Sequence, residues 1–147
     1  MSVNMTHVGI TVKNLEESIK FYEMLDFTRR VSINFKHEFF GAHPEVYGVE
    51  AQAYVEFMQG PNGMNLELFQ FDPQSDEAGN MKWDRPCLNH LGLQIDSLPE
   101  LDAKLRAAGV NYLMPMETRG NGSNWLWITD PSGNLIEIVE PMPPKKD

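Results

Sequence analysis

Two histidines, His7 and His90, each begin the same short pattern: a histidine, an aliphatic residue, a glycine and a further aliphatic residue. The two copies of this pattern lie far apart in the chain, one near its beginning and one in its second half. Side chains alternate between the two faces of a strand, so each histidine shares a face with its glycine, Gly9 or Gly92. Imidazole is a common metal ligand. A histidine at equivalent positions of two repeats therefore directs attention to metal binding.

Two glutamates occupy a second repeated pattern, in which a Pro/Gly turn leads into a strand with a glutamate between two aliphatic residues. Glu67 stands in the first copy and Glu137 in the second. The flanking aliphatic residues are expected to meet helices, so the glutamates point to the other face, where we also place the histidines. Carboxylates and imidazoles are costly to bury alone, and a shared cation compensates for this cost.

We therefore predict one divalent metal site whose ligands are His7, Glu67, His90 and Glu137. Mixed nitrogen and oxygen donors suit several first-row ions, so Ni, Co, Zn, Mn and Fe all remain candidates for the cofactor. The same four ligands assemble whether the two repeats pair within one chain or with repeats of a second chain. We expect a homodimer, because one curved sheet per repeat leaves edges and concave surface to cover.

The repeats predict an α+β fold of two tandem β-α-β-β-β modules, forming a curved mixed sheet around a concave metal-binding cavity. The whole chain is interpreted as a single domain of 147 residues. Its expected parts are module one at about 5–72, a linker at about 73–87, module two at about 88–140 and a disordered tail at 141–147.

Each module is expected to contain one amphipathic helix. Asn14 is the predicted N-cap of a helix over 15–25. The second helix begins with a capping box at Ser97 and ends at Gly109. Between the first helix and the end of module one, the segment 34–50 follows no clean period and makes the first module longer than the second. Loops of this length are often lids or partner contacts, and the sequence leaves the role of this excursion open.

Phe57 and Trp127 form another pair with the same offset as the two glutamates, one strand away from them. They either fill the core or line an apolar pocket for a small-molecule substrate. Arg119, in a glycine-rich loop, is the candidate substrate-binding arginine. The other candidate anion clamps are Arg29, Arg30 and Arg85, and the remaining histidines, His37 and His43, are expected at the surface.

Composition excludes several classes of partner. The 21 acidic residues outnumber the 12 basic ones and give a formal net charge of −9, which disfavours nucleic acid and anionic membrane surfaces. No apolar run approaches the roughly 20 residues that cross a bilayer. The single cysteine forms no intrachain disulfide. We therefore expect a soluble protein of the cytoplasm that acts on a small molecule.

The chain resembles the vicinal oxygen chelate superfamily over about residues 5–140. The paired modules, the two His-x-Gly openings and the ending Asp130-Pro131-x-Gly133-Asn134-x-x-Glu137 carry this resemblance. The superfamily includes glyoxalase I, bleomycin-resistance proteins, extradiol dioxygenases, methylmalonyl-CoA epimerase and fosfomycin-modifying thiol transferases. The resemblance is specific for the fold and the metal site rather than for the reaction.

The resemblance implies that all four predicted ligands bind the metal, with Glu137 as the proton-transfer base and Glu67 as a second catalytic carboxylate. The pattern is most similar to glyoxalase I, which also has a glutamate at the position of Glu67, whereas the epimerase has a glutamine there. It therefore implies a lyase that transfers a proton through a metal-bound enediolate of a thiol-oxoaldehyde adduct.

Other members of the superfamily provide the alternatives. Dioxygenases and thiol transferases use two histidines and one carboxylate, so a fourth protein ligand argues against them. Antibiotic-binding members typically lack the ligands altogether, and the full set argues against that class more firmly. An acyl-CoA epimerase, an extradiol dioxygenase, a thiol transferase and a non-catalytic protein that holds a cationic drug all remain open.

Overall fold

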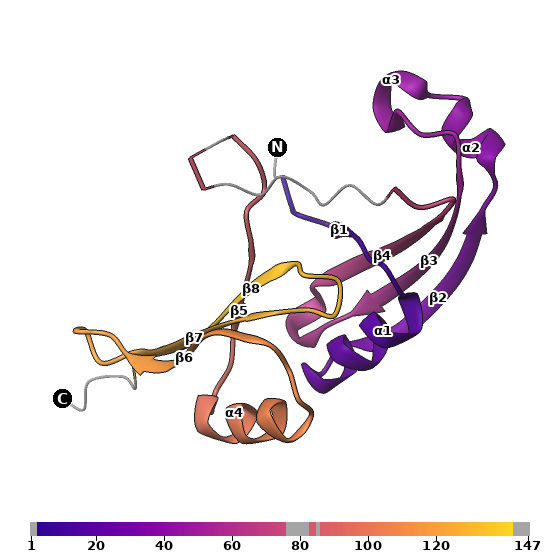
Figure 1. Cartoon of the computed structure of the whole chain (residues 1–147). Helices are drawn as coiled ribbons and strands as arrows, with labels where there is room; N and C mark the ends of the chain where they lie inside the picture. Colours follow the sequence, from indigo (N-terminus) through magenta and orange to yellow (C-terminus); the bar gives the residue numbers. More distant parts are fainter. Residues whose placement is uncertain (1–2, 76–82, 85, 143–147) are drawn as a thin grey trace. The chain divides into compact units, whose positions relative to one another are not determined.

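The computed structural model describes residues 3–75, 83–84 and 86–142. It divides the chain into two compact units, Met1–Ala78 and Gly79–Asp147, which we call unit 1 and unit 2. Each unit contains one β-α-β-β-β module, as the repeats predict (Figure 1). Much of the predicted linker and residues 143–147 of the predicted tail lie outside the described residues.

Unit 1 forms a four-stranded mixed sheet with the strand order β1-β4-β3-β2. β1 runs parallel to β4, while β3 is antiparallel to both β4 and β2. The elements of this unit are β1 (Val8–Thr11), α1 (Leu15–Met24), β2 (Thr28–Phe35), α2 (His37–Gly41), α3 (Pro44–Tyr47), β3 (Gln52–Gln59), a 3-10 turn (Pro61–Gly63) and β4 (Asn65–Asp72).

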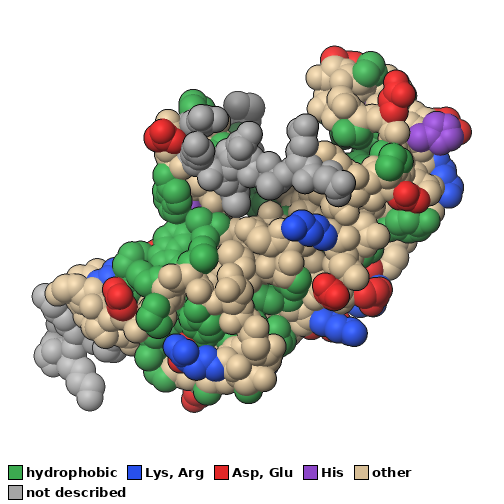
Figure 2. Space-filling model, in the orientation of Figure 1, with side chains coloured by type: hydrophobic (Ala, Val, Ile, Leu, Met, Phe, Trp, Pro, Cys, Tyr) green, Lys and Arg blue, Asp and Glu red, His purple; other side chains and the backbone are tan. Residues whose placement is uncertain are grey.

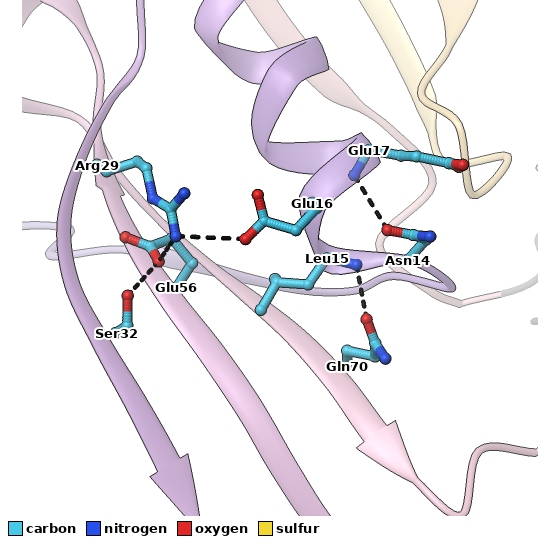
Figure 3. Close-up of polar contacts among 8 residues, drawn as sticks. All are labelled: Asn14, Leu15, Glu16, Glu17, Arg29, Ser32, Glu56 and Gln70. Carbon is cyan, nitrogen blue, oxygen red and sulfur yellow. Dashed lines mark hydrogen bonds and ion pairs between the residues drawn. The ribbon is translucent and has the colours of Figure 1, made fainter.

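Helix α1 covers one face of the unit 1 sheet, which we call its helix face (Figure 1). The predicted cap is confirmed, because the Asn14 side chain accepts a hydrogen bond from the backbone N–H of Glu17 at 3.1 Å (Figure 3). Ile19 and Tyr22 are buried on this helix, as are Leu66 and Leu68 on β4. Apolar burial of this kind stabilises the layer, and it leaves Glu67 on the opposite face.

An ion pair between the exposed Arg29 and the buried Glu56 joins β2 and β3 on the helix face. Glu56 and Met58 lie on this face and are both buried. The guanidinium of Arg29 donates to Oε2 of Glu56 at 3.0 Å (Figure 3). The Ser32 hydroxyl donates to the same oxygen at 2.5 Å, and Glu16 of α1 lies 3.5 Å from the guanidinium. A buried carboxylate requires such partners, because its desolvation is otherwise unfavourable.

The excursion 34–50 contains two short helices, α2 and α3, that the sequence did not predict. Phe40 of α2 is buried with Ala53 and Val55 of β3. Its ring lies 5.3 Å from that of Phe71, an ordinary separation for packed aromatic rings. Aromatic packing therefore anchors this segment to the face of the sheet opposite α1.

Unit 2 repeats this arrangement with the strand order β5-β8-β7-β6. β5 runs parallel to β8, while β7 is antiparallel to both β8 and β6. Its elements are β5 (Leu91–Gln94), α4 (Leu98–Ala107), β6 (Tyr112–Thr118), β7 (Asn124–Thr129) and β8 (Leu135–Glu140). The α+β prediction is confirmed, and each module forms a four-stranded sheet of its own.

Helix α4 buries Leu98, Leu101 and Leu105, whose spacing places them on one face of the helix. Gly109 has a positive φ of 72°, a conformation that favours glycine and ends the helix as predicted. The predicted capping box is wrong in one respect, because the side chain of Ser97 makes no capping hydrogen bond. In the described part of the chain, no helix has both the length and the apolar character needed to cross a membrane.

Candidate metal centre

Unit 1 brings His7 and Glu67 together on the face opposite α1. Gly9 of β1 is the register partner of Glu67 of β4, so the histidine two residues earlier lies beside the glutamate. His7 Nδ1 is 3.6 Å from Glu67 Oε1. The parallel pairing of β1 with β4 thus places two metal-ligating side chains next to one another, although most of unit 1 separates them in sequence.

Unit 2 places His90 and Glu137 in the corresponding positions. Gly92 of β5 is the register partner of Glu137, and His90 Nε2 lies 3.7 Å from Glu137 Oε2. A Cβ atom at Gly92 would stand 4.0 Å from the same oxygen. Gly92 therefore lies directly beside the carboxylate and leaves space there, whereas a Cβ atom at Gly9 would meet the ring of Phe69 at 3.4 Å.

The two pairs have spacings that suit metal binding. Both N···O separations exceed ordinary hydrogen-bond length. Two donors that each lie about 2.1 Å from a shared ion are at most about 4.2 Å apart, so the histidine and the glutamate of each pair are close enough to bind the same cation. Among the described residues, neither unit adds a third His, Cys, Asp or Glu to its pair. Each unit therefore supplies half of the predicted donor set.

Asn89 orients the imidazole of His90. Its side-chain oxygen lies 2.6 Å from His90 Nδ1. An amide oxygen only accepts hydrogen bonds, so Nδ1 is the donor in this contact and Nε2 is the nitrogen that faces Glu137. Carbonyl partners of this kind typically orient metal-binding histidines. Sequence reasoning missed Asn89, although a polar side chain next to a candidate ligand was the available signal.

The predicted substrate residues lie on the same faces as the glutamates. Phe57 is the register partner of Glu67, and Trp127 is the register partner of Glu137. Phe57 packs against the buried cluster around Phe40, whereas the ring of Trp127 lies 5.0 Å from that of His90. Phe57 therefore has a clear packing role, and Trp127 flanks the candidate ligand.

The other two tryptophans of the chain also lie near this site in unit 2. Trp83 stacks on His90 at 5.2 Å, and Trp125 lies 6.1 Å from Trp127. Neither position could be predicted from the sequence, because Trp83 stands in a polar linker and the offset between the repeats pairs Trp125 with Val55 rather than with another aromatic residue. Aromatic rings therefore contact the candidate ligand His90, whereas among the described residues none contacts His7.

The candidate anion-binding arginines lie in different environments. Arg119 contacts Glu137 through its guanidinium, and its Cζ lies 3.9 Å above the ring of Trp125. Arg29 pairs with Glu56 on the helix face, so it lies on the opposite side of the sheet from Glu67. Arg30 donates to Gln59. Arg85 lies outside the described residues.

The two remaining histidines are at the surface, as predicted. His37 of α2 lies 3.3 Å from Glu38, and His43 lies 3.3 Å from Glu45 of α3. Figure 2 shows a histidine beside acidic side chains at this end of unit 1. These exposed pairs belong to the α2–α3 segment and take no part in the two candidate ligand pairs.

Comparison with known proteins establishes the family. Residues 4–138 match the model of the Glyoxalase/Bleomycin resistance protein/Dioxygenase superfamily, and the chain belongs to that superfamily. One relative is the probable trivalent organoarsenical cleaving enzyme of Bacillus subtilis (strain 168). It is 30% identical over 141 residues, which cover 90% of this chain and 76% of the relative.

Solved structures share the fold. A glyoxalase family protein from Bacillus cereus superposes with a TM-score of 0.77 at 20% identity, covering 95% of each chain. A mutant of the fosfomycin resistance protein FosX from Listeria monocytogenes has a TM-score of 0.66 at 18% identity, covering 94% of this chain and 92% of that one. That structure contains Mn(II) and 1S,2S-dihydroxypropylphosphonic acid.

Proposed function

We propose that the protein is a metal-dependent enzyme in which His7, Glu67, His90 and Glu137 bind one divalent ion. The observation that carries this proposal is the presence of a His–Glu contact in each unit, at 3.6 Å from Nδ1 of His7 in unit 1 and at 3.7 Å from Nε2 of His90 in unit 2. Mixed imidazole and carboxylate donors suit Ni, Co, Zn, Mn or Fe. The Mn(II) in the FosX structure supports metal binding on this fold.

The reaction that we propose is a glyoxalase I-type isomerisation of a thiol-oxoaldehyde adduct. The bound ion supplies a Lewis acid that polarises the substrate oxygens and stabilises charge developing on them. Glu137 removes the proton from the carbon that bears sulfur and returns it to the neighbouring carbon, so a hemithioacetal becomes a thioester without any external oxidant. Glu67 is the second carboxylate of the site.

The neighbouring residues support binding of an apolar group beside the reacting atoms. Trp127 lies edge-on to His90, and Trp83 covers the imidazole from another side. Phe57 occupies the equivalent register position beside Glu67. In this proposal Trp127 and Phe57 line the substrate site, and their aromatic surfaces exclude water from the proton transfer. The enzyme is expected to act as a homodimer.

The decisive assay uses the hemithioacetal of methylglyoxal with the protein loaded separately with each of the five metals. We expect thioester formation with at least one metal. Glu137→Gln should lower kcat by at least about a hundredfold, the scale of a lost general base. Glu45→Gln, at an exposed position of α3, serves as the control and should retain activity. Absence of turnover with every metal would overturn the glyoxalase assignment.

A second candidate is cleavage of a trivalent organoarsenical. The relative from Bacillus subtilis, 30% identical over most of this chain, favours it. Thiolates are soft ligands, and the only cysteine of the sequence is Cys87, three residues before His90. Release of inorganic arsenite from a methylated trivalent arsenical, lost in Cys87→Ser, would support this reaction. Cys87→Ser should leave hemithioacetal turnover unchanged.

A further inference from the structure

Arg119 binds one of the two oxygens of Glu137. The guanidinium contacts Oε1, whereas Oε2 of the same carboxylate is the atom that faces His90 Nε2 at 3.7 Å. The two oxygens therefore have different partners. One oxygen of the Glu137 carboxylate therefore faces His90, and the other is held by the guanidinium of Arg119.

The position of Arg119 is defined by three further contacts. Its guanidinium lies 3.9 Å above the ring of Trp125, a separation typical of cation–π contact. Its backbone N–H donates to the carbonyl oxygen of Ser123 at 2.8 Å, and its own carbonyl accepts from the N–H of Gly122 at 2.8 Å. The turn fixes the backbone while the tryptophan supports the guanidinium.

The two units differ at this point. In the described part of unit 1, Glu67 has His7 as its ion-pair partner and no arginine beside it. The offset that relates the two glutamates pairs Arg119 with Val49, an apolar residue. The arginine is therefore one of the features that distinguish Glu137 from Glu67. An additional positive charge near a cation site opposes metal binding, so its presence there calls for a role.

We propose that Arg119 is a positioning residue, which prevents Glu137 from binding the metal ion through both oxygens. The inference rests on the proposed function. With Oε1 held by the guanidinium, only Oε2 is available to the ion, and the carboxylate stays weakly held. A weakly held carboxylate is the one able to take a proton from the substrate. Without Arg119, both oxygens turn to the cation and Glu137 becomes a tight ligand but a poor base.

The test compares Arg119→Met and Arg119→Lys with the unchanged protein, using Mn²⁺ and Ni²⁺ in isothermal titration calorimetry. Removing a neighbouring positive charge and freeing Oε1 should lower the metal dissociation constant about tenfold in Arg119→Met. Arg119→Lys keeps the charge, so its metal dissociation constant should lie between those of Arg119→Met and the unchanged protein. Arg30→Met, at an arginine that contacts Gln59, should bind metal as the unchanged protein does.

Turnover of the hemithioacetal completes the test. We expect kcat of Arg119→Met to fall at least tenfold while KM changes little, because substrate binding is not the role proposed here. Weaker metal binding together with a lower Tm would show a merely structural contact and overturn the inference. A raised KM with an unchanged metal dissociation constant would identify a substrate clamp and also overturn it. Failure of the unchanged protein to bind metal would instead overturn the proposed function itself.

Discussion

Asn89 and His90 form a contact of 2.6 Å between the amide oxygen and Nδ1, and this contact determines which imidazole nitrogen faces Glu137. We predict that Asn89→Ala weakens metal binding about 10- to 100-fold, the range typical of lost partners of metal-binding histidines. Calorimetric titration measures the change. Asn111→Ala, whose amide donates to Thr129, is the matched control and should bind metal normally. Metal affinity of Asn89→Ala within twofold of normal would contradict this role.

Gly92 leaves space beside the Glu137 carboxylate. A Cβ atom there would make ordinary van der Waals contact with Oε2 at 4.0 Å. Gly92→Ala should therefore retain metal binding, whereas Gly92→Leu should lower both metal affinity and turnover at least tenfold, because the larger side chain crowds the carboxylate. Thermal unfolding of both variants checks that the fold survives. Equal activity in Gly92→Leu and the unchanged protein would show that this space has no function.

The Arg29–Glu56 pair lies on the helix face of unit 1, and we predict that it contributes to stability rather than to catalysis. Arg29→Met leaves the buried Glu56 carboxylate with Ser32 as its remaining hydrogen-bond partner (Figure 3). The free energy of unfolding should fall by about 2 kcal/mol, since an unpaired buried charge is costly. Arg30→Met should change it by less than about 0.5 kcal/mol. Chemical denaturation distinguishes these values, and equal losses would refute the assignment.

Asp102 gives unit 2 a stability that depends on pH. Burial tends to raise the pKa of Asp102, but hydrogen bonds from Arg106 at 2.9 Å and Tyr112 at 2.8 Å outweigh burial and hold this pKa below its ordinary value. A lowered pKa stabilises the folded state above the unfolded pKa of about 3.9, and this contribution is lost as pH falls through the folded pKa. Asp102→Asn should therefore lose less stability than the unchanged protein between about pH 5 and about pH 2.5. Denaturant titrations at both pH values compare the two proteins, and parallel losses would contradict the prediction.

The modules could be predicted from the sequence because their defining residues repeat. The His-x-Gly patterns and the glutamates between aliphatic residues place each candidate ligand on a strand and on one face of it. The register then follows from the parallel pairing of β1 with β4 and of β5 with β8. Strand alternation and helix periodicity are local properties, so they can be read without knowledge of the fold.

Features that depend on packing between distant segments could not be predicted. Phe40 anchors α2 through contacts with β3 and Phe71, and nothing periodic in the excursion indicates them. The approach of Arg119 to Glu137 depends on the turn after β6, and one arginine in a glycine-rich loop resembles any surface charge. The ion pair of Glu56 was the easiest of these features to predict, because a carboxylate that shares a strand face with Met58 requires a partner.

The most direct test of the account is the metal stoichiometry and affinity of the unchanged protein, measured alongside His7→Ala and His90→Ala. We predict one divalent ion per set of two His–Glu pairs, and a loss of affinity of at least about a hundredfold in each variant, since each removes a ligand of the same ion. Two ions per set, or a variant of one unit that leaves binding intact, would contradict a shared metal centre.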